Sequence, residues 1–579
     1  MTLLQQAGPA PTLTDAQTER RQPGSARDRG LLVLTWLVLL ALIAGPIVYV
    51  VVAAVSANPA ELGSGFDFTA VHDVFATGSM LSLLARSVAF ALVVGVLSTV
   101  LATALAWTTV RLQIWGSRVR ETLCLGSLFI APFVTAVAWV WLATPQTGVI
   151  NKILISWHLP SWLQPDVLST YGMIFVLVAH YVPYGYLLVS ASMRRIDTRM
   201  EEASLLCGRG MGFTALRISL PMLRAALLSS VLFVAILALG EFSVPAILDQ
   251  AGAFAPLSVT VYTALYGANQ NLPLAAAVST ELMIVAMIGL YLYQRTMRRG
   301  ERFVSVSGRG HADSRVRTSR LTGAIVWVVT LAYGVITFLI PLAAVVLMAL
   351  SQYLAPSLGG MHLSFANLWS SLDTPEIRTA TINTIELAIA VPVVSIVIGI
   401  VVVFLADRLR LRTARGLTYL ATAPLSVPGL VMGTGLLLLL IRTPLYGSLT
   451  LIGIGLIAVS VTHAVRLVSN GVQQIDPSLE EASQVCGVSR FRTVWSVLVP
   501  LIRPSVFSAF ILIFVLTMRE LNVAVTLSTP NTPVLSVVAW NYSSSALTKS
   551  AAVGLLQLAI MLVGMGVLRA AFRINRRKA

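Results

Sequence analysis

Long apolar runs separated by short polar segments dominate this chain of 579 residues. The runs are continuous rather than alternating in polarity, and most have about twenty residues, so each is suited to cross the hydrocarbon core as a helix. The pattern predicts twelve spans, near residues 31–55, 84–110, 122–143, 172–193, 226–248, 275–294, 322–350, 380–406, 417–441, 449–469, 505–527 and 551–571. We therefore expect an all-α integral membrane protein with about twelve transmembrane helices.

Composition supports a membrane protein, and the distribution of charge removes one alternative. The chain is 56% hydrophobic and 11% charged, whereas a soluble domain is roughly 25% charged. A net charge of +16 is compatible with nucleic-acid binding, but the positive charges follow the topology. If the N-terminus is cytoplasmic, the Lys and Arg residues on the outer side are only Arg86, Lys152, Arg378, Arg442 and Lys549, out of 40. This is the positive-inside rule, so we expect cytoplasmic termini, contact with membrane lipid and no bound nucleic acid.

One stretch of the chain occurs twice. Residues 196–221 align without a gap with residues 475–500, so each position recurs 279 residues later (202 to 481). The identical residues are Ile196, Asp197, Glu201, Glu202, Ala203, Ser204, Cys207, Gly208, Thr214 and Pro221, matched by Ile475, Asp476, Glu480, Glu481, Ala482, Ser483, Cys486, Gly487, Thr493 and Pro500. Because polar residues carry most of the match, shared hydrophobicity does not explain it, and we infer an internal repeat.

The repeat extends further and divides the chain into two halves of the same orientation. Glu241 recurs as Glu520 at the same offset, and Ser87 at the start of span two recurs as Thr384 at the start of span eight. Six spans on each side predict parallel repeats related by an axis along the membrane normal. The expected domains are a cytoplasmic tail (1–30), a first six-span half (31–294), a cytoplasmic linker (295–320) and a second six-span half (321–579). The arginine-rich linker is suited to lie in solvent beside anionic headgroups, with a specific regulatory site as the alternative.

The repeated stretch lies in the cytoplasmic loop before span five and again in the loop before span eleven. Asp197 and Asp476 stand where they can cap a short helix, and Gly208 and Gly487 permit a sharp turn after it. A proline then enters the first turn of the next span, where its missing N–H is tolerated. We expect one short helix across the cytoplasmic mouth of each half, presenting its acidic pair and small residues to another protein.

This pattern, Glu202-Ala203-Ser204-x3-Gly208-x9-Ile218-x-Leu220-Pro221, resembles the EAA loop of type I ABC importer permeases. Ser replaces the second Ala of the family motif in both copies, and Val497 and Val499 replace the Ile and Leu in the second, but acid, glycine and proline remain. In that family the loop forms a coupling helix seated in a groove of a cytoplasmic ATPase. The resemblance implies this role for Glu201, Glu202, Ala203, Ser204, Gly208 and Pro221, and for Glu480, Glu481, Ala482, Ser483, Gly487 and Pro500.

The resemblance also implies the partners and the location. A binding-protein-dependent importer of the bacterial inner membrane has two copies of an ATPase subunit and an extracytoplasmic solute-binding protein. No Gly-x4-Gly-Lys-Ser/Thr motif occurs in this chain, so we expect ATP and Mg²⁺ on a separate ATPase. The chain itself would be a membrane-spanning subunit with no catalytic residue and no cofactor.

The cargo is indicated by a second, more local resemblance. Fused permeases of twelve spans include those for ferric iron, thiamine and some phosphonates. The segment from Gly240 to Leu248 is similar to the fifth span of the ferric-iron permeases, and Arg519-Glu520-Leu521-Asn522 resembles their second half. We favour ferric iron, with thiamine, 2-aminoethylphosphonate or another small solute as alternatives.

Four acidic residues are predicted within spans, where ionisable groups usually face the bundle interior. Glu241 and Glu520 either line the translocation path or belong to packing networks, as Arg519 beside Glu520 would permit. Glu281 in span six and Glu386 in span eight are further candidates for the path or for helix packing.

Two histidines within spans suggest a metal site at first sight. His180 and His463 do not occupy equivalent positions of the repeat, and no carboxylate or Cys lies at ligand spacing from either. We therefore expect packing histidines and no metal site.

A secondary transporter can also have twelve spans in two parallel halves, and it is the alternative from a different class. It would couple through intramembrane ion or proton sites and would need no ATPase. The duplicated loop discriminates between the two classes, because an ion-coupled carrier has no reason to keep it. A membrane-embedded enzyme is a less favoured alternative, because no catalytic cluster of His, Asp, Ser or Cys is apparent.

Overall fold

The computed structural model describes residues 26–578 apart from 62, 64, 197–198, 250–253, 301–315, 318, 355–360, 409–412 and 477. In this part of the chain the only strands are β1 (Leu112–Gln113) and β2 (Val316–Arg317), which pair in parallel. The predicted tail (1–30) and linker (295–320) lie largely outside the described residues. Helix α1 begins at Ala26, and helix α14 continues to Gly300.

Nine continuous helical stretches in the described residues are long and apolar enough to cross a membrane. In the first half they are α1–η1–α2 (Ala26–Leu39, Leu40–Ala44, Gly45–Ala54), α4 (Gly78–Val110), α8 (Thr170–Arg195), α10–η4–α11 (Met211–Thr214, Ala215–Ser219, Leu220–Leu239) and α14 (Leu272–Gly300). In the second half they are α15–η6–α16 (Arg320–Gly334, Val335–Leu339, Ile340–Leu350), α18–η8 (Pro375–Val403, Phe404–Arg408), α21 (Leu449–Val472) and α28 (Leu547–Lys578). The predicted fold class, all-α and membrane-spanning, is confirmed.

Spans three and nine are broken rather than straight. Span three consists of α5–η2 (Ser117–Leu125, Gly126–Phe129) and α6 (Pro132–Ala143), which meet at 93°, and span nine of α19–η9 (Ala414–Thr422, Ala423–Ser426) and α20 (Gly429–Leu440), which meet at 107°. Pro132 and Pro428 stand at the breaks. A proline drives the residue before it to extended backbone, and ψ is 143° at Ala131 and 114° at Val427. The spans predicted over 122–143 and 417–441 are therefore each a bent pair of helices rather than one continuous helix.

Spans five and eleven end earlier than predicted. Helix α11 ends at Leu239 and α25 (Arg503–Arg519) at Arg519, and the short helices α12 (Ser243–Leu248) and α26 (Asn522–Leu527) follow them. Helix α25 is also bent by 70° against the preceding η10–α24 (Val494–Leu498, Val499–Leu501). Glu241 and Glu520, which we predicted within spans five and eleven, therefore lie in the breaks after the spanning helices.

Five-residue π-helical turns precede a proline in four spans. Proline lacks the N–H that bonds to the carbonyl four residues earlier, and its ring crowds that carbonyl, so the preceding turn widens to π-helical spacing. The turns are Leu40–Ala44 before Pro46, Ala215–Ser219 before Pro221, Val335–Leu339 before Pro341, and Val494–Leu498 before Pro500. Each half has this feature in its first and fifth spans, which hydrophobic patterning alone did not reveal.

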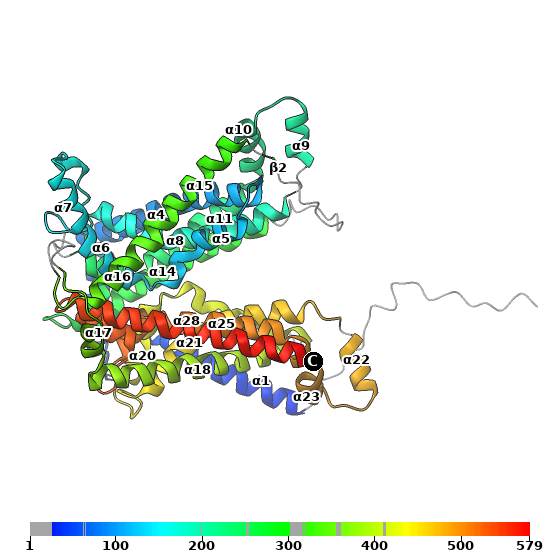
Figure 1. Cartoon of the computed structure of the whole chain (residues 1–579). Coiled ribbons are helices and arrows are strands. Elements are labelled where there is room, and N and C mark those ends of the chain that lie inside the picture. The colour runs from blue at the N-terminus through cyan, green and yellow to red at the C-terminus, as the bar shows by residue number, and fades with distance from the viewer. Residues whose placement is uncertain are drawn as a thin grey trace, which may run out of the picture.

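The first span of each half packs against the other half. The α1–η1–α2 span contacts α19, α20 and α21, and the α15–η6–α16 span contacts α5, η2 and α6. Figure 1 shows α1 among the second-half helices, and α15 and α16 among those of the first half. An added Cβ on Gly416 would stand 2.8 Å from the indole of Trp36, and one on Gly116 would stand 2.6 Å from that of Trp327. Each helical bundle therefore contains the first helix of the other half.

The two bundles converge at one end of the molecule and diverge towards the other. The converging end carries α17 (Phe365–Leu372). The diverging end carries α9 (Arg199–Leu206) on one bundle and α22 (Ser478–Val485) on the other (Figure 1). The two copies of the repeated stretch thus lie at the same end of the molecule, one on each bundle.

Glycine is required where the exchanged first helix meets α20. A Cβ on Gly435 would lie 2.4 Å from the backbone oxygen of Pro46, which has no rotamer with which to move away. We expect Gly435→Ala to cost about 1–3 kcal/mol of stability, which a thermal unfolding curve in detergent would show. Gly566→Ala in α28, where a Cβ meets nothing within 4 Å, is the matched control. Equal unfolding temperatures for the two variants would contradict this close packing.

Candidate functional site

Two short helices at the diverging end, α9 and α22, have the same construction. Each is followed by a glycine in the left-handed region, with φ of +74° at Gly208 and +81° at Gly487. Residues other than glycine rarely adopt this backbone conformation. The predicted sharp turn is therefore present after both helices, at a residue type that permits it. Asp476 caps α22 by accepting a hydrogen bond from the backbone N–H of Ser478 at 2.9 Å. Its counterpart Asp197 lies outside the described residues.

A pair of hydroxyl groups fastens each short helix to the start of the next span. Ser204 Oγ lies 2.9 Å from Thr214 Oγ1 in α10, and Ser483 Oγ lies 3.0 Å from Thr493 Oγ1 in α23 (Arg490–Thr493). The two bonds occupy equivalent positions of the repeat. They explain why a serine and a threonine ten residues apart recur together.

The first acid of α9 forms a buried ion pair. Glu201 Oε2 lies 3.1 Å from Arg111 Nε, and the two side chains are 10% and 7% exposed. Glu201 Oε1 accepts a further hydrogen bond from Ser219 Oγ at 2.8 Å. Burial lowers the pKa of the Arg111 guanidinium, and the Glu201 carboxylate opposes that shift. Because Arg111 directly follows α4, the pair links α9 to span two. Glu480, the counterpart of Glu201, is buried as well.

The outward faces of the two short helices are apolar and equally exposed. Leu206 and Val485, which are equivalent in the repeat (206 to 485), are each 88% exposed. Met200, Glu202 and Ala203 in α9, and Leu479, Glu481 and Ala482 in α22, are exposed as well. Positions three residues apart share a helix face, so each helix has an apolar ridge. Apolar surface of this kind is typical of protein interaction sites.

The breaks after spans five and eleven hold a second pair of equivalent acids. The Glu241 carboxylate accepts hydrogen bonds from the backbone N–H of Ser243 at 3.0 Å and from the Tyr181 hydroxyl at 3.1 Å. The Glu520 carboxylate accepts one from the backbone N–H of Val523 at 3.3 Å. Each therefore caps the short helix that follows it, which is why the spanning helices end before these residues.

Matching hydrogen bonds hold the next helices, α13 (Leu257–Tyr266) and α27 (Leu535–Tyr542). The backbone N–H of Leu257 donates to Ser87 Oγ at 3.2 Å, and that of Leu535 donates to Thr384 Oγ1 at 2.9 Å. The following serine in each helix donates its hydroxyl to the backbone carbonyl of the capping glutamate, at 2.8 Å and 2.9 Å. Ser87 and Thr384 are therefore equivalent in space, as the sequence predicted.

Several known proteins are similar to this chain. Residues 383–577 match the family described as "Binding-protein-dependent transport system inner membrane component". The chain is 26% identical to the ferric transport system permease protein FbpB of Actinobacillus pleuropneumoniae over 83% of this chain and 69% of that protein. It is 25% identical to the putative ferric transport system permease protein FbpB 1 of Haemophilus influenzae, over 77% and 70% of the two chains. It is 23% identical to the Fe(3+)-transport system permease protein FbpB 2 of that organism, over 88% and 93%. The chain is similar to ABC importer permeases.

The described residues include helices long and apolar enough to cross a membrane several times, and the relatives are named as permease proteins of transport systems. The family match falls on the second half, whereas the three relatives align with most of the chain.

Arg519 reaches from the second half into the first. Its guanidinium donates hydrogen bonds to the Tyr184 hydroxyl at 2.9 Å and to the carbonyl of Leu128, and it lies 3.4 Å from Nε2 of His180. Among the described side chains, Arg519 forms no ion pair with Glu520, because its acceptors lie across the interface. His180 is buried against this group, as a packing histidine would be.

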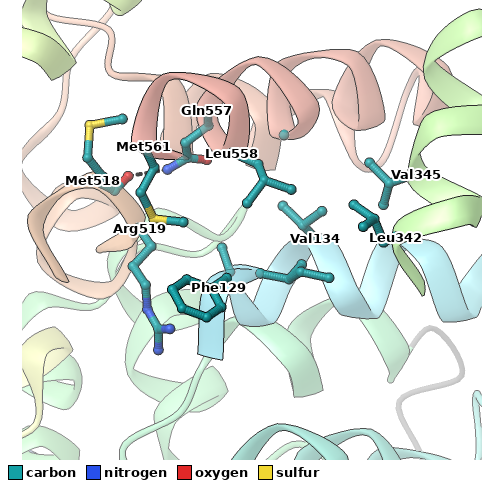
Figure 2. A pocket seen from close by; sticks show the side chains of 12 residues that line it. Phe129, Val134, Leu342, Val345, Met518, Arg519, Gln557, Leu558 and Met561 are labelled. Carbon is teal, nitrogen blue, oxygen red and sulfur yellow. Dashed lines mark hydrogen bonds between the residues drawn. The ribbon is translucent and has the colours of Figure 1, made fainter. Parts of the chain in front are cut away.

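Figure 2 shows the pocket that Arg519 lines at the junction of the halves. Its other lining residues include Phe129, Val134, Leu342, Val345, Met518, Gln557, Leu558 and Met561. The Gln557 amide donates to the carbonyl of Met518, and the Arg519 guanidinium points away from Gln557. The rest of the lining is apolar, so this pocket is a packing gap and not a site for a hydrated solute.

The structure does not bring all four predicted path acids together, but Glu241 and Glu520 lie near enough to interact electrostatically. Glu241 and Glu520 are equivalent helix caps. Glu281 is buried in α14, and neither of its carboxylate oxygens has a hydrogen-bond partner among the residues that the structure describes. Glu386 is exposed on α18. In the described part of the permease, no group of three His, Cys, Asp or Glu is placed to hold a metal ion.

Sequence reasoning gave no role to Arg111, Thr214 or Tyr181. Thr214 was part of the repeat. Its identity with Thr493 could have indicated that the same hydrogen bond forms in both halves. Arg111 follows a span directly, where a cation is ordinary under the positive-inside rule, so nothing local marked it as a partner of Glu201. Tyr181 lies 60 residues before Glu241 (181 to 241) and was one aromatic residue among many in the spans.

Proposed function

We propose that this permease imports ferric iron, driven by two copies of a cytoplasmic ATPase that bind at α9 and α22. Support for the cargo comes from three relatives named for ferric or Fe(3+) transport, which align with 77–88% of the chain. Support for the docking site comes from Leu206 and Val485, equivalent apolar residues that are each 88% exposed. Two equivalent surfaces at one end suit two copies of one partner.

The diverging end, which carries α9 and α22, faces the cytoplasm in this proposal. The support is the concentration of Lys and Arg in the segments on that side of the spans. Both termini then lie on the cytoplasmic side of a bacterial inner membrane. The converging end faces the solute-binding protein on the opposite side. ATP and Mg²⁺ belong to the ATPase, and this chain binds neither.

Helices α9 and α22 act as coupling helices, and their residues divide into two roles. The outward side meets the ATPase through Glu202, Ala203 and Leu206, and through Glu481, Ala482 and Val485. The inward side fixes each helix to the spans through Glu201, Ser204, Gly208 and Pro221, and through Glu480, Ser483, Gly487 and Pro500. A displacement of α9 then reaches span two through the Glu201–Arg111 ion pair, and span five through the chain itself.

The diverging bundles correspond to the inward-facing state. ATP binding draws the two ATPase copies together, so that α9 and α22 approach each other and the bundles close at that end (Figure 1). The converging end opens in response and receives cargo from the solute-binding protein. ATP hydrolysis then restores the arrangement seen here.

Cargo is tested with the permease, its ATPase and its solute-binding protein in proteoliposomes. We expect uptake of Fe(III) that requires all three components and ATP. Uptake of thiamine or 2-aminoethylphosphonate in place of iron would contradict the proposed cargo. It would still agree with an ATP-driven mechanism. Uptake by the permease without any ATPase would instead support an ion-coupled carrier.

Native cysteines provide a direct test of docking. Cys207 and Cys486 are exposed directly after α9 and α22, and Cys124 is buried. We expect a maleimide to label Cys207 and Cys486 in the isolated permease, and bound ATPase to protect both. Cys124 should stay unlabelled throughout, because structural buried thiols are inert. Peptide mass spectrometry quantifies each site, and unchanged labelling of Cys207 and Cys486 in a stable complex would contradict docking at these helices.

A further inference from the structure

Two aromatic residues at equivalent positions of the repeat meet at the boundary between the halves. Tyr262 lies on α13 and Trp540 on α27, at the offset that also separates Leu257 from Leu535 (262 to 540, 257 to 535). The Trp540 indole N–H donates to the Tyr262 hydroxyl at 3.4 Å. The two rings meet edge to face, with centroids 5.9 Å apart and planes at 85°.

Contact between equivalent residues locates them close to the repeat axis. Two residues related by an approximate two-fold axis lie on opposite sides of it at equal distances, so they touch only when both are near it. In parallel repeats this axis runs along the membrane normal. A passage between the two halves follows the same line, so Tyr262 and Trp540 stand across it.

Two further rings complete the contact. Phe242 is fully buried and packs against both residues, with centroid distances of 4.5 Å to Tyr262 and 4.9 Å to Trp540. Tyr266 lies 5.4 Å from Tyr262, and its hydroxyl donates to the backbone carbonyl of Thr526 in the second half at 2.6 Å. Rings from both halves therefore fill the region around the axis.

The two sides of the contact differ in shape, although their backbones are equivalent. Phe242 corresponds to Leu521 in the second half (242 to 521), so the first half supplies the larger side chain at this position. The smaller Leu521 belongs to the side that supplies the larger Trp540. Large and small side chains thus alternate, which allows dense packing where identical bulky groups would collide.

The contact is connected to the docking helices through the chain. Phe242 follows α11, which continues from η4 and therefore from the loop that contains α9. Ser258 bonds the backbone carbonyl of Glu241, so α13 is attached to the same break. Movement of span five relative to the second half would thus act directly on the rings.

We propose that Tyr262, Trp540 and Phe242 form an aromatic closure, which blocks the passage in the inward-facing state and parts when α9 and α22 approach each other. The closure rests on the proposed function, because it needs an ATP-driven change between two states. Ring packing and single hydrogen bonds make it, so it can open and reform without breaking a buried ion pair.

Crosslinking between the two halves tests the closure. Tyr262→Cys with Trp540→Cys is built in a background of Cys124→Ala, Cys207→Ser and Cys486→Ser, with a protease site inserted in the linker. After treatment with a short reducible bis-maleimide and proteolysis, the halves should stay joined on a gel in the nucleotide-free complex. ATP with vanadate should lower the crosslink yield severalfold. Thr263→Cys with Trp540→Cys, one residue along α13 on its exposed side, is the matched control and should crosslink poorly in both states.

The outcomes separate the closure from the proposed function. Uptake should stop in the crosslinked permease and return when the crosslink is reduced. Crosslink yields that do not change with nucleotide, or uptake through the crosslinked protein, would contradict the closure. Neither result would contradict ATPase docking. Failure of the ATPase to bind at all would contradict the proposed function. The crosslink yield does not depend on which cargo is transported.

An ion-leak measurement provides a second readout should the cysteine pair fold poorly. Nucleotide-free proteoliposomes with Tyr262→Ala and Trp540→Ala should leak small ions severalfold faster than those with the unchanged permease. Tyr262→Phe with Trp540→Phe keeps the rings and should stay tight. An alanine pair that folds and remains as tight as the phenylalanine pair would contradict the closure.

Discussion

Leu206→Asp combined with Val485→Asp should abolish both ATPase binding and ATP-driven uptake. Each side chain is 88% exposed, so a carboxylate in its place remains hydrated in the isolated permease and leaves its stability unchanged. In the docked state the same carboxylate would be buried against the partner without a matching charge, at a cost of about 2 kcal/mol or more at each helix. Co-purification with the ATPase and uptake in proteoliposomes measure the two effects.

Leu206→Met combined with Val485→Met is the matched control for this pair. Both replacements keep an apolar side chain, so binding and uptake should be retained. Each single aspartate variant should weaken binding less than the pair, because one intact helix still docks. Normal co-purification of the double aspartate variant would contradict our placement of the ATPase.

Glu201→Ala should detach α9 from span two and strongly reduce uptake, although Glu201 does not face the ATPase in our proposal. The change leaves the Arg111 guanidinium buried and without its ion pair, and breaking a buried pair in this way costs about 3–5 kcal/mol. Proteolysis of the loop around α9 should become faster, which reports local release of the helix. Uptake should fall in parallel, because movement of α9 no longer reaches α4.

Removing both charges distinguishes an unpaired charge from loss of the link itself. Glu201→Ala with Arg111→Met has no buried charge left, so protease resistance of the α9 loop should recover in part. Uptake should remain low in the double variant, since the mechanical link is still absent. Full recovery of uptake would contradict a transmitting role for the ion pair and leave it a purely stabilising one.

Hydropathy predicted where the spanning helices lie because an apolar run in a bilayer has to be helical. It could not predict the bends in spans three and nine, since residues on both sides of Pro132 and Pro428 are apolar and the run continues through the break. The ends of spans five and eleven were missed for a different reason. Glu241 and Glu520 stop the helices by capping the next ones, and a carboxylate within an apolar run gives no sign of which backbone N–H it will bind.

The short helices α9 and α22 were predictable because their determinants are local. Asp476 and Gly487 lie within twelve residues of each other (476 to 487). Asp476 accepts a hydrogen bond from the backbone N–H of Ser478, and Gly487 turns the chain through its positive φ. The Glu201–Arg111 pair and the Tyr262–Trp540 contact join segments distant in the chain, and their geometry follows from packing of the whole bundle. The exchange of first helices was invisible for the same reason, since hydropathy does not show which bundle a span joins.

The exchange of first helices imposes an order on biosynthesis. Trp36 packs on Gly416, which the ribosome adds 380 residues later (36 to 416). At about 5–20 residues per second, α1 therefore waits in the bilayer for roughly 20–80 seconds before its partner helix is synthesised. For most of that time the first bundle also lacks α15 and α16, so neither half can reach its final packing alone. The nascent protein depends on whatever holds unpartnered membrane helices during translation, and a chain severed in the linker would have to exchange helices between two pieces that are already inserted.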